Sequence, residues 1–281
     1  MKIFNNIADL QSEIRNHKAN GNTIGFVPTM GALHRGHISL VDASKAACDI
    51  TVVSIFVNPT QFNKRSDFEH YPITLKKDIK QLTEAGCDIL FNPDEKEMYP
   101  VPDNRTFEFD GIDQVMEGHF RPGHFNGVAQ IVSKLFDAVT PDQAFFGQKD
   151  FQQLAIIKHL VKSEAYTIKV NGTPIVREED GLAMSSRNVR LSPVERAKSV
   201  RISQVLFEVK QKVWNTPVEE IIEWVESQFK NDPDFKFEYF DIVNAGTLQS
   251  INSWNEGEEM NACIAVFVGN VRLIDNIFLS I

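Results

Sequence analysis

Up to about residue 176, apolar and polar positions follow an order that predicts strands separated by helices. Short, continuous apolar runs rich in β-branched and aromatic residues are typical of strands covered on both faces. These runs occupy residues 23–28, 51–57, 87–91, 144–146 and 166–170. Segments with helical spacing precede or separate them, at residues 1–21, 36–47, 74–85, 128–139 and 151–162. This alternation predicts βαβ units and an α/β fold, with a parallel sheet and helices on both of its faces.

The pattern changes after about residue 176, where helical segments are followed by strand-like runs. The helical segments are residues 193–214 and 218–230. The strand-like runs are residues 235–243, 262–268 and 271–279, with Gly269-Asn270 as the turn of a hairpin. Helices followed by antiparallel strands predict a smaller α+β unit. We therefore expect domains at residues 1–175 and 176–281.

The composition limits the partners that we expect. The 281 residues include 38 acidic and 29 basic side chains, for a formal net charge of −9. Such an acidic field repels phosphate backbones, so we expect no nucleic-acid partner. No stretch reaches the roughly 18 apolar residues that a membrane span needs, so we expect no membrane partner either. Cys48, Cys87 and Cys263 are far apart and form no CxxC pair, which indicates reduced thiols and a cytoplasmic location rather than disulfides or a zinc site.

The densest chemical signal is VPTMGALHRGHISLV, at residues 27–41. A strand ends there, Gly31 and Gly36 permit tight backbone geometry, and a helix begins beside His37. A helix N-terminus favours phosphate, and His34 and His37 are spaced so that both can face it. This HxGH arrangement resembles the signature of nucleotidyl-transferases and class I tRNA synthetases. The residues alone leave a metal site or a structural turn open, although no third metal ligand with suitable spacing is evident.

A polar cluster follows the second predicted strand, in FVNPTQF. The carboxyl ends of parallel strands are where open α/β sheets bind ligands. Asn58 and Gln61 carry neutral amides that both donate and accept hydrogen bonds, which suits a hydroxy acid. A simple loop cap is the alternative reading of this segment.

A third cluster is FFGQKDFQQ, at residues 145–153. Lys149 supplies a mobile positive charge beside Gly147, where the backbone can approach a ligand closely. Asp150 either caps the following helix or supports Lys149 or a magnesium ion. Gln153 lies one turn further on and can face the same substrate.

A fourth cluster is VREEDGLAMSSRN, at residues 176–188. Its Met-Ser-Ser-Arg run, residues 184–187, resembles the flexible KMSKS-type loop of the same superfamily. Small hydroxyls and one cation on a mobile loop can close over a triphosphate and then release pyrophosphate.

Together, TMGALHRGH, FVNPTQF, FFGQKDFQQL and REEDGLAMSSRN resemble the pantothenate synthetase family in their order and spacing. The resemblance covers about residues 23–191 and continues more loosely to the end of the chain. It implies a homodimer with a Rossmann-like N-terminal domain and a smaller C-terminal lid domain. It also implies condensation of pantoate with β-alanine at the expense of ATP, with Mg²⁺.

The resemblance implies roles for individual residues. ATP contacts are expected from Met30, Gly31, Ala32, Leu33, His34, Arg35, Gly36, His37, Gly147, Gln148, Lys149, Asp150, Val176, Met184, Ser185, Ser186 and Arg187. Pantoate and β-alanine are expected at Asn58, Gln61, Arg121 and Gln153, and the metal near Asp78 and Gln81. The catalytic residues are expected to be His37, His34 and Lys149. The chain departs from the family pattern at Ile73, where a basic residue is usual, and at Gln148, where Glu is frequent. No role is expected for His119, His124 or His159.

The expected first step joins an acid to AMP. A carboxylate is already ionised at neutral pH, so this step needs positive groups around the phosphates rather than a general base. His34, His37, Lys149, Arg187, magnesium and the helix N-terminus are the expected sources of that charge. An amine then attacks the acyl adenylate, and AMP leaves. The alternatives are a nucleotidyl-transferase acting on a small phosphorylated acceptor, a tRNA-binding relative, and a nucleotide sensor without catalysis.

Overall fold

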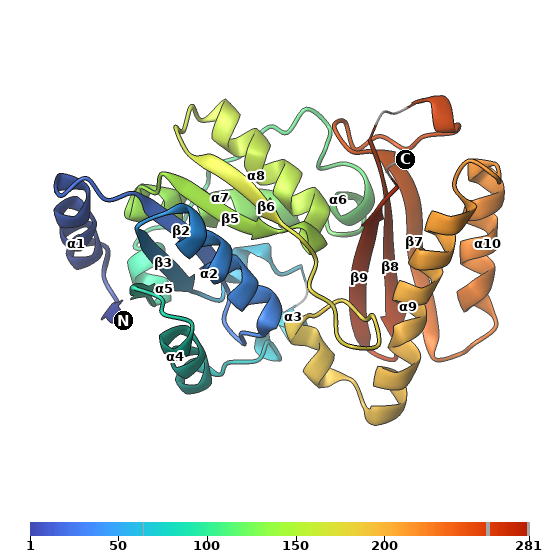
Figure 1. Ribbon diagram of the computed structural model, residues 1–281, viewed down its shortest axis with the longest axis horizontal. Coiled ribbons are helices and arrows are strands. Elements are labelled where there is room, and N and C mark those ends of the chain that lie inside the picture. The colour runs from blue at the N-terminus through green and yellow to red at the C-terminus, as the bar shows by residue number, and fades with distance from the viewer. Residues whose placement is uncertain (64, 257–258, 280–281) are drawn as a thin grey trace.

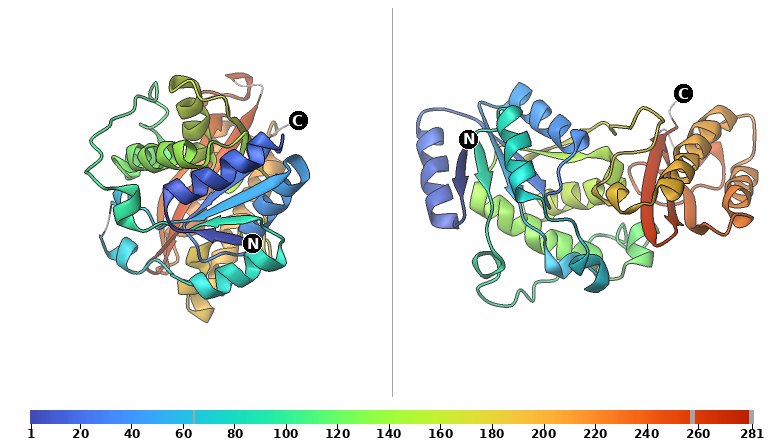
Figure 2. Two further views of the ribbon diagram at one scale, coloured as in Figure 1. Left: turned by 90° about the vertical axis from the view of Figure 1, so that its left-hand side faces the viewer. Right: turned by 90° about the horizontal axis from the view of Figure 1, so that it is seen from below.

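The computed structural model describes residues 1–63, 65–256 and 259–279, and its strands form two separate sheets. The first sheet contains β1 (Lys2–Phe4), β2 (Ile24–Thr29), β3 (Ile50–Ile55), β4 (Ile89–Phe91), β5 (Gln143–Gly147) and β6 (Lys169–Thr173). It is a six-stranded parallel sheet in the order β1-β4-β3-β2-β5-β6. The second contains β7 (Phe235–Asn244), β8 (Met260–Val268) and β9 (Val271–Phe278), paired antiparallel. The two sheets lie side by side in separate units (Figures 1 and 2), and the predicted fold class is confirmed.

The helices of the larger unit connect its strands and cover both faces of the sheet. They are α1 (Ile7–Ala19), α2 (Arg35–Ala47), α3 (Arg65–Glu69), α4 (Leu75–Glu84), α5 (Glu95–Met98), α6 (Met116–Phe120), α7 (His124–Val139) and α8 (Phe151–Ser163). Short 3₁₀ turns follow β3 at η1 (Pro59–Gln61) and β5 at η2 (Gln148–Asp150). Successive strand residues alternate between two cores, because side chains along a strand point to opposite faces. Phe26 packs with α1, α7 and α8, while Val27 packs with α2 and α4.

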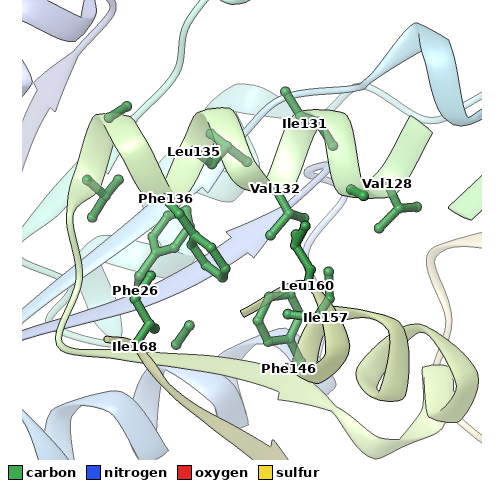
Figure 3. Packing of buried hydrophobic residues seen from close by; sticks show 14 of the residues in the cluster. Phe26, Val128, Ile131, Val132, Leu135, Phe136, Phe146, Ile157, Leu160 and Ile168 are labelled. Carbon is green, nitrogen blue, oxygen red and sulfur yellow. The ribbon is translucent and has the colours of Figure 1, made fainter. Parts of the chain in front are cut away.

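The larger core is built on α7. Phe136 is 1% exposed and packs edge-on against Phe26, Phe146 and Tyr166, with ring centroids 6.3, 6.5 and 5.6 Å away. Figure 3 shows Val132 and Phe136 directed from α7 toward the sheet and α8. Truncating such a buried ring to alanine costs about 3–5 kcal/mol. This core therefore fixes the sheet whose strand ends carry the polar clusters.

The smaller unit packs two helices against its sheet. Helices α9 (Pro193–Lys212) and α10 (Val218–Lys230) cover the face that points away from the larger unit (Figure 1). A capping box at Ser192 and Glu195 begins α9, and Gly269-Asn270 turns β8 into β9 as predicted. The opposite face of the sheet meets the larger unit. The predicted boundary at residue 175 falls in the segment between β6 and α9.

Helix α7 and strand β6 are among the elements whose bounds differ from the sequence prediction. Helix α7 begins at His124. The sequence prediction placed its start at residue 128, because Gly123 and Gly127 weaken the helical pattern before that residue. A Cβ on Gly127 would lie 2.5 Å from the carbonyl oxygen of Thr60, so this glycine allows α7 to approach η1. Strand β6 begins at Lys169 rather than at residue 166, because Tyr166 packs into the core before pairing with β5 starts.

Some elements were not predicted: β1 and the short helices α3, α5 and α6. Each is five residues or fewer, so hydrophobic periodicity has too little length to register. Across the described residues, no helix is both long enough and apolar enough to cross a membrane.

Candidate active site

Most of the predicted site residues meet at the carboxyl ends of β2, β3 and β5, where the larger unit faces the smaller one. The chain runs outward from β2 to β3 on one side and to β5 on the other, which makes this edge the switch point where open sheets bind ligands. A cavity lies there. The predicted residues on its wall are Met30, His34, Gly36, His37, Asn58, Gln61, Gly147, Lys149, Asp150, Gln153, Val176, Met184, Ser185, Ser186 and Arg187.

The loop between β2 and α2 is held from behind by Asp78 of α4. Leu33 N–H and the Thr74 hydroxyl donate to its Oδ1 at 2.9 and 3.0 Å, and Ala32 N–H donates to its Oδ2 at 3.0 Å. Gly31 has φ +81°, and a Cβ there would lie 3.2 Å from Oδ2. Asp78 is fully buried, so its carboxylate shapes this loop from inside the protein.

His34 and His37 are oriented by backbone hydrogen bonds at the start of α2. Gly36 N–H donates to Nδ1 of His34 at 3.1 Å, and His34 N–H donates to Nδ1 of His37 at 3.3 Å. A Cβ on Gly36 would lie 2.9 Å from the His34 ring, so glycine makes room for this arrangement. In a neutral imidazole whose Nδ1 accepts, the proton sits on Nε2. Both rings border the cavity, with centroids 4.1 Å apart, and each is a fixed Nε2–H donor.

Both histidines are neutral in the protein without bound ATP. Burial, followed by the charge of Lys149, lowers the pKa of His34 to about 4. Burial, with His34 and Lys149 as further causes, lowers the pKa of His37 well below its usual range. The positive charge expected of the histidines is therefore absent in the protein without bound ATP. They contribute N–H dipoles, and the cationic groups on the wall are Lys149 and Arg187.

Asn58 and Gln61 occupy unequal positions. Asn58 is 1% exposed, donates to Gln61 Oε1 and to the Gly127 carbonyl at 3.1 Å each, and accepts from the Tyr99 hydroxyl at 2.7 Å. Its amide is thus engaged with the protein. By accepting from Asn58, Gln61 Oε1 turns its Nε2 outward, where it donates to Met30 Sδ at 3.3 Å. Gln61 is therefore the amide presented to a ligand, and Asn58 orients it.

His124, for which the sequence offered no role, supports the same turn. Its buried Nδ1–H donates to the carbonyl of Gln61 at 2.8 Å. Burial, followed by the charge of Arg121, lowers the pKa of His124 to about 3. The ring is neutral, and it fixes the backbone of Gln61. The only sequence signal was its place in RPGHFNGV.

Lys149 and Asp150 lie in η2, directly after β5. The Lys149 ammonium is 3.7 Å from Asp150 Oδ1, and the side chains are 17% and 48% exposed. The Asp150 side chain makes no capping hydrogen bond to α8, so the capping alternative is not what the structure shows. Gln153, one turn further along α8, borders the cavity with them.

The segment 176–188 closes the cavity from the side of the smaller unit. Ser186 hydroxyl donates to the Ala32 carbonyl at 3.0 Å, which ties this segment to the loop before α2. Arg187 pairs with Asp67 of α3 at 2.9 Å, and Arg190 pairs with the same carboxylate at 2.8 Å. Arg187 therefore borders the cavity while its guanidinium is paired with Asp67 of α3.

A second chamber adjoins the first and reaches the smaller unit. The chambers share the wall residues Met30, Gln61, Lys149, Asp150, Gln153 and Arg187. Arg121 borders the second chamber, 3.4 Å from Glu117. Glu117 also accepts two 2.7 Å hydrogen bonds from Arg272 of β9 and one from Tyr239 of β7 at 2.9 Å. Burial opposes ionisation of Glu117, but the Arg272 guanidinium outweighs it and lowers the pKa of the carboxyl to about 2.

Sequence reasoning missed Glu117, Tyr239 and Arg272. The spacing of Glu117 and Arg121, one helical turn apart, was the available signal. Nothing in the sequence pairs Glu117 with a strand 155 residues away.

Several predicted residues lie off the walls of both chambers. They are Gly31, Ala32, Leu33, Arg35 and Gln148. Arg35 is exposed on α2, and Ala32 and Leu33 give their N–H groups to Asp78. Ile73, one of the two departures from the family pattern, is 80% exposed before α4.

The geometry does not support the predicted metal site at Asp78 and Gln81. Both Asp78 oxygens are occupied by protein donors, and neither residue borders a chamber. The buried Oε1 of Gln81 has no hydrogen-bond partner, but one amide oxygen is too few ligands for a protein-held ion. Among the residues that the structure covers, no three His, Cys, Asp or Glu side chains gather as a metal site.

Known proteins match nearly the whole length of the chain. The family profile of pantoate-beta-alanine ligase matches residues 2–278. The pantothenate synthetase of Bacteroides thetaiotaomicron is 53% identical, over 99% of this chain and 98% of its own. That of Porphyromonas gingivalis is 50% identical, over 99% of both chains.

Solved structures give the same result. The crystal structure of pantothenate synthetase from Thermus thermophilus matches with a TM-score of 0.93 and 38% identity, covering both chains completely. Pantoate-beta-alanine ligase from Francisella tularensis, complexed with beta-gamma ATP and beta-alanine, matches with a TM-score of 0.83 and 37% identity, over 99% of this chain and 98% of its own. With the profile, the sequence relatives and the solved structures in agreement over its length, the chain belongs to the pantoate-beta-alanine ligase family.

Proposed function

We propose that the two chambers carry the two steps of an ATP-dependent condensation of pantoate with β-alanine, through a pantoyl-adenylate. Family membership establishes the ligase activity; the division of labour between residues is the proposal. The observation that carries it is the meeting of two fixed Nε2–H donors, a helix N-terminus and Lys149 on one cavity wall. The Francisella relative was solved with beta-gamma ATP and beta-alanine, so both ligand types are expected in this cavity.

In the first step, the pantoate carboxylate attacks the α-phosphorus of ATP, and pyrophosphate leaves. The forming bond needs no general base, but negative charge builds on the phosphates. His34, His37 and Lys149 would stabilise that charge with preorganised N–H groups. In the protein without ATP the histidines are neutral; their Nε2–H groups would donate hydrogen bonds to the phosphates, and Lys149 would supply a full positive charge. Gln61 and Gln153 would orient the pantoate.

In the second step, the β-alanine ammonium gives one proton to solvent, and its neutral nitrogen attacks the acyl carbon. A C–N bond forms, the bond between that carbon and the AMP oxygen breaks, and the nitrogen gives a second proton to solvent as AMP leaves. The second chamber suits a zwitterion, because Arg121 can meet a carboxylate and Asp150 can meet an ammonium. Its shared wall lets the amine reach the adenylate without a path through bulk water. Segment 176–188 would exclude water from the intermediate.

Magnesium would enter with the triphosphate. Mg²⁺ commonly binds through one or two carboxylates together with substrate phosphates, and Asp150 is a half-exposed carboxylate on the shared wall. The donor set thus fits an ATP-borne ion. When bound, the ion would neutralise part of the phosphate charge.

We also propose a cytoplasmic homodimer. The unpaired thiols of Cys48, Cys87 and Cys263 fit a reducing compartment. Dimerisation rests on the likeness to the family.

Product analysis with Mg-ATP and pantoate, with and without β-alanine, tests the proposal. Stoichiometric AMP, pyrophosphate and amide only with both substrates is the expected result. ADP would point to an acyl phosphate and overturn the adenylate. A stable nucleotidylated product would support the transferase alternative, and ATP binding without turnover would support a sensor.

A further inference from the structure

A buried asparagine of the smaller unit holds the backbone that carries Lys149. Asn276 of β9 is 2% exposed, and its Nδ2 donates to the carbonyls of Gln148 and Lys149 at 3.0 and 2.8 Å. Both hydrogens of that amide are used, one for each carbonyl. This contact joins residues 128 and 127 positions apart and bridges the two units at η2.

The orientation of the Asn276 amide is determined by its neighbours. The two carbonyls can only accept, so the nitrogen must face them and Oδ1 must point back into the smaller sheet. There it accepts a hydrogen bond from Nδ2 of Asn261 on β8, at 3.1 Å. Asn261 is fully buried. Asn261 of β8 thus orients the amide of Asn276 on β9 so that its two N–H groups face η2.

The backbone of Asn276 is also fixed. Arg177 donates to both carboxylate oxygens of Asp275, at 2.6 and 3.0 Å, and to the Asn276 carbonyl at 3.2 Å. Asn276 N–H donates to Asp275 Oδ1 at 2.7 Å. Arg177 lies at the start of the segment that closes the cavity. The asparagine therefore sits in a rigid frame, while η2 is a single three-residue 3₁₀ turn without a side-chain cap.

We propose that Asn276 is a positioning residue for Lys149: by holding the carbonyls of Gln148 and Lys149, it places the Lys149 ammonium for adenylation. This inference rests on the role proposed above for Lys149. Misplacement of a catalytic group by about 1 Å can cost about 10²-fold in rate, so the clamp acts on turnover as well as on stability. A contact that merely docks the two units would affect stability alone.

The test uses Asn276→Asp in the full-length enzyme. Aspartate is nearly isosteric and still accepts from Asn261, but it turns an oxygen toward two carbonyls. The expected result is a fall of roughly 10- to 100-fold in kcat for pyrophosphate release, with the KM for pantoate changed less than about threefold.

Gln130→Glu is the matched control. Gln130 is 6% exposed, and its Nε2 donates to two backbone carbonyls, those of Asp103 and Arg105, at 3.0 and 2.8 Å. It lies outside both chamber walls. Thermal unfolding should shift downward in both variants, while kcat of the control stays within about twofold of wild type. A wild-type kcat for Asn276→Asp, or an equal loss in the control, would overturn the proposal.

A double-mutant cycle separates action through Lys149 from any other effect. In the Lys149→Ala background, Asn276→Asp should lower kcat by less than about twofold further. A full multiplicative loss would show that Asn276 acts by another route. Wild-type turnover in Lys149→Ala would instead remove Lys149 from the mechanism. If Asn276→Asp does not fold, Asn276→Ala removes the donors without adding charge; wild-type kcat in that variant would also overturn the proposal.

Discussion

Replacing Asp78 by asparagine tests whether this residue shapes the loop before α2 or holds a metal. Asparagine can still accept from Leu33 N–H and the Thr74 hydroxyl through Oδ1, but its Nδ2 then faces Ala32 N–H, donor against donor. One hydrogen bond to a charged group is lost, about 1.5–3 kcal/mol, and a buried donor is left unpaired, about 1–3 kcal/mol. We expect a total loss of about 2.5–6 kcal/mol in the free energy of unfolding.

Urea unfolding measures that loss, and a titration of Mg²⁺ in the pyrophosphate-release assay measures the metal dependence. The expected result is lower stability and lower kcat, because the loop carrying His34 moves, with the half-saturating Mg²⁺ concentration unchanged. Asp49→Asn is the control, since the exposed Asp49 also accepts two hydrogen bonds, both from Thr23 and both through one oxygen. Full stability together with a raised Mg²⁺ requirement in Asp78→Asn would refute the structural role.

Three other predictions follow from the site. His37→Ala should lower kcat by about 10²–10³-fold, because one preorganised donor is lost, with a circular dichroism spectrum like that of wild type. Burial, followed by the Arg121 charge, holds the pKa of His124 near 3, below the 6.5 of a free histidine. As pH falls, His124 is therefore protonated in the unfolded chain before it is protonated in the folded protein. The free energy of unfolding decreases between about pH 6.5 and pH 3 for this reason. His124→Gln should flatten that part of a plot of unfolding free energy against pH. Glu117→Gln should cost about 1.5–3 kcal/mol in urea unfolding, because Arg272 keeps Glu238 but loses one of its two carboxylate partners; a loss below about 1 kcal/mol would contradict the pairing.

The sequence predicted the strands and the longer helices because their signals are local. A buried parallel strand is a short apolar run, and an amphipathic helix repeats over several turns. The predicted site residues converge for a related reason: each cluster follows a strand of one parallel sheet, and the carboxyl ends of such strands share an edge. Elements without a local signal, such as β1 and α6, were missed because only their tertiary neighbours stabilise them.

Long-range polar contacts could not be predicted in this way. Arg272 meets Glu117 and Asn276 meets Lys149 only because the smaller sheet packs across the carboxyl edge of the larger one. No periodicity in the sequence encodes that packing. Asp78 shows the same limit, since the resemblance suggested a metal ligand where the fold places a loop support.

The histidine pair shows how far environment changes the chemistry that a motif suggests. The spacing in HRGH was enough to expect two rings at one phosphate, but not their charge. Moving an imidazolium out of water disfavours its charged form, and the nearby ammonium of Lys149 disfavours it further. Two neutral donors and one cation bind a triphosphate less tightly than three cations would, yet they still stabilise charge that develops at the α-phosphate. Because uniform binding does not raise kcat, weaker binding of the resting triphosphate costs no turnover as long as the donors meet the charge that develops in the transition state.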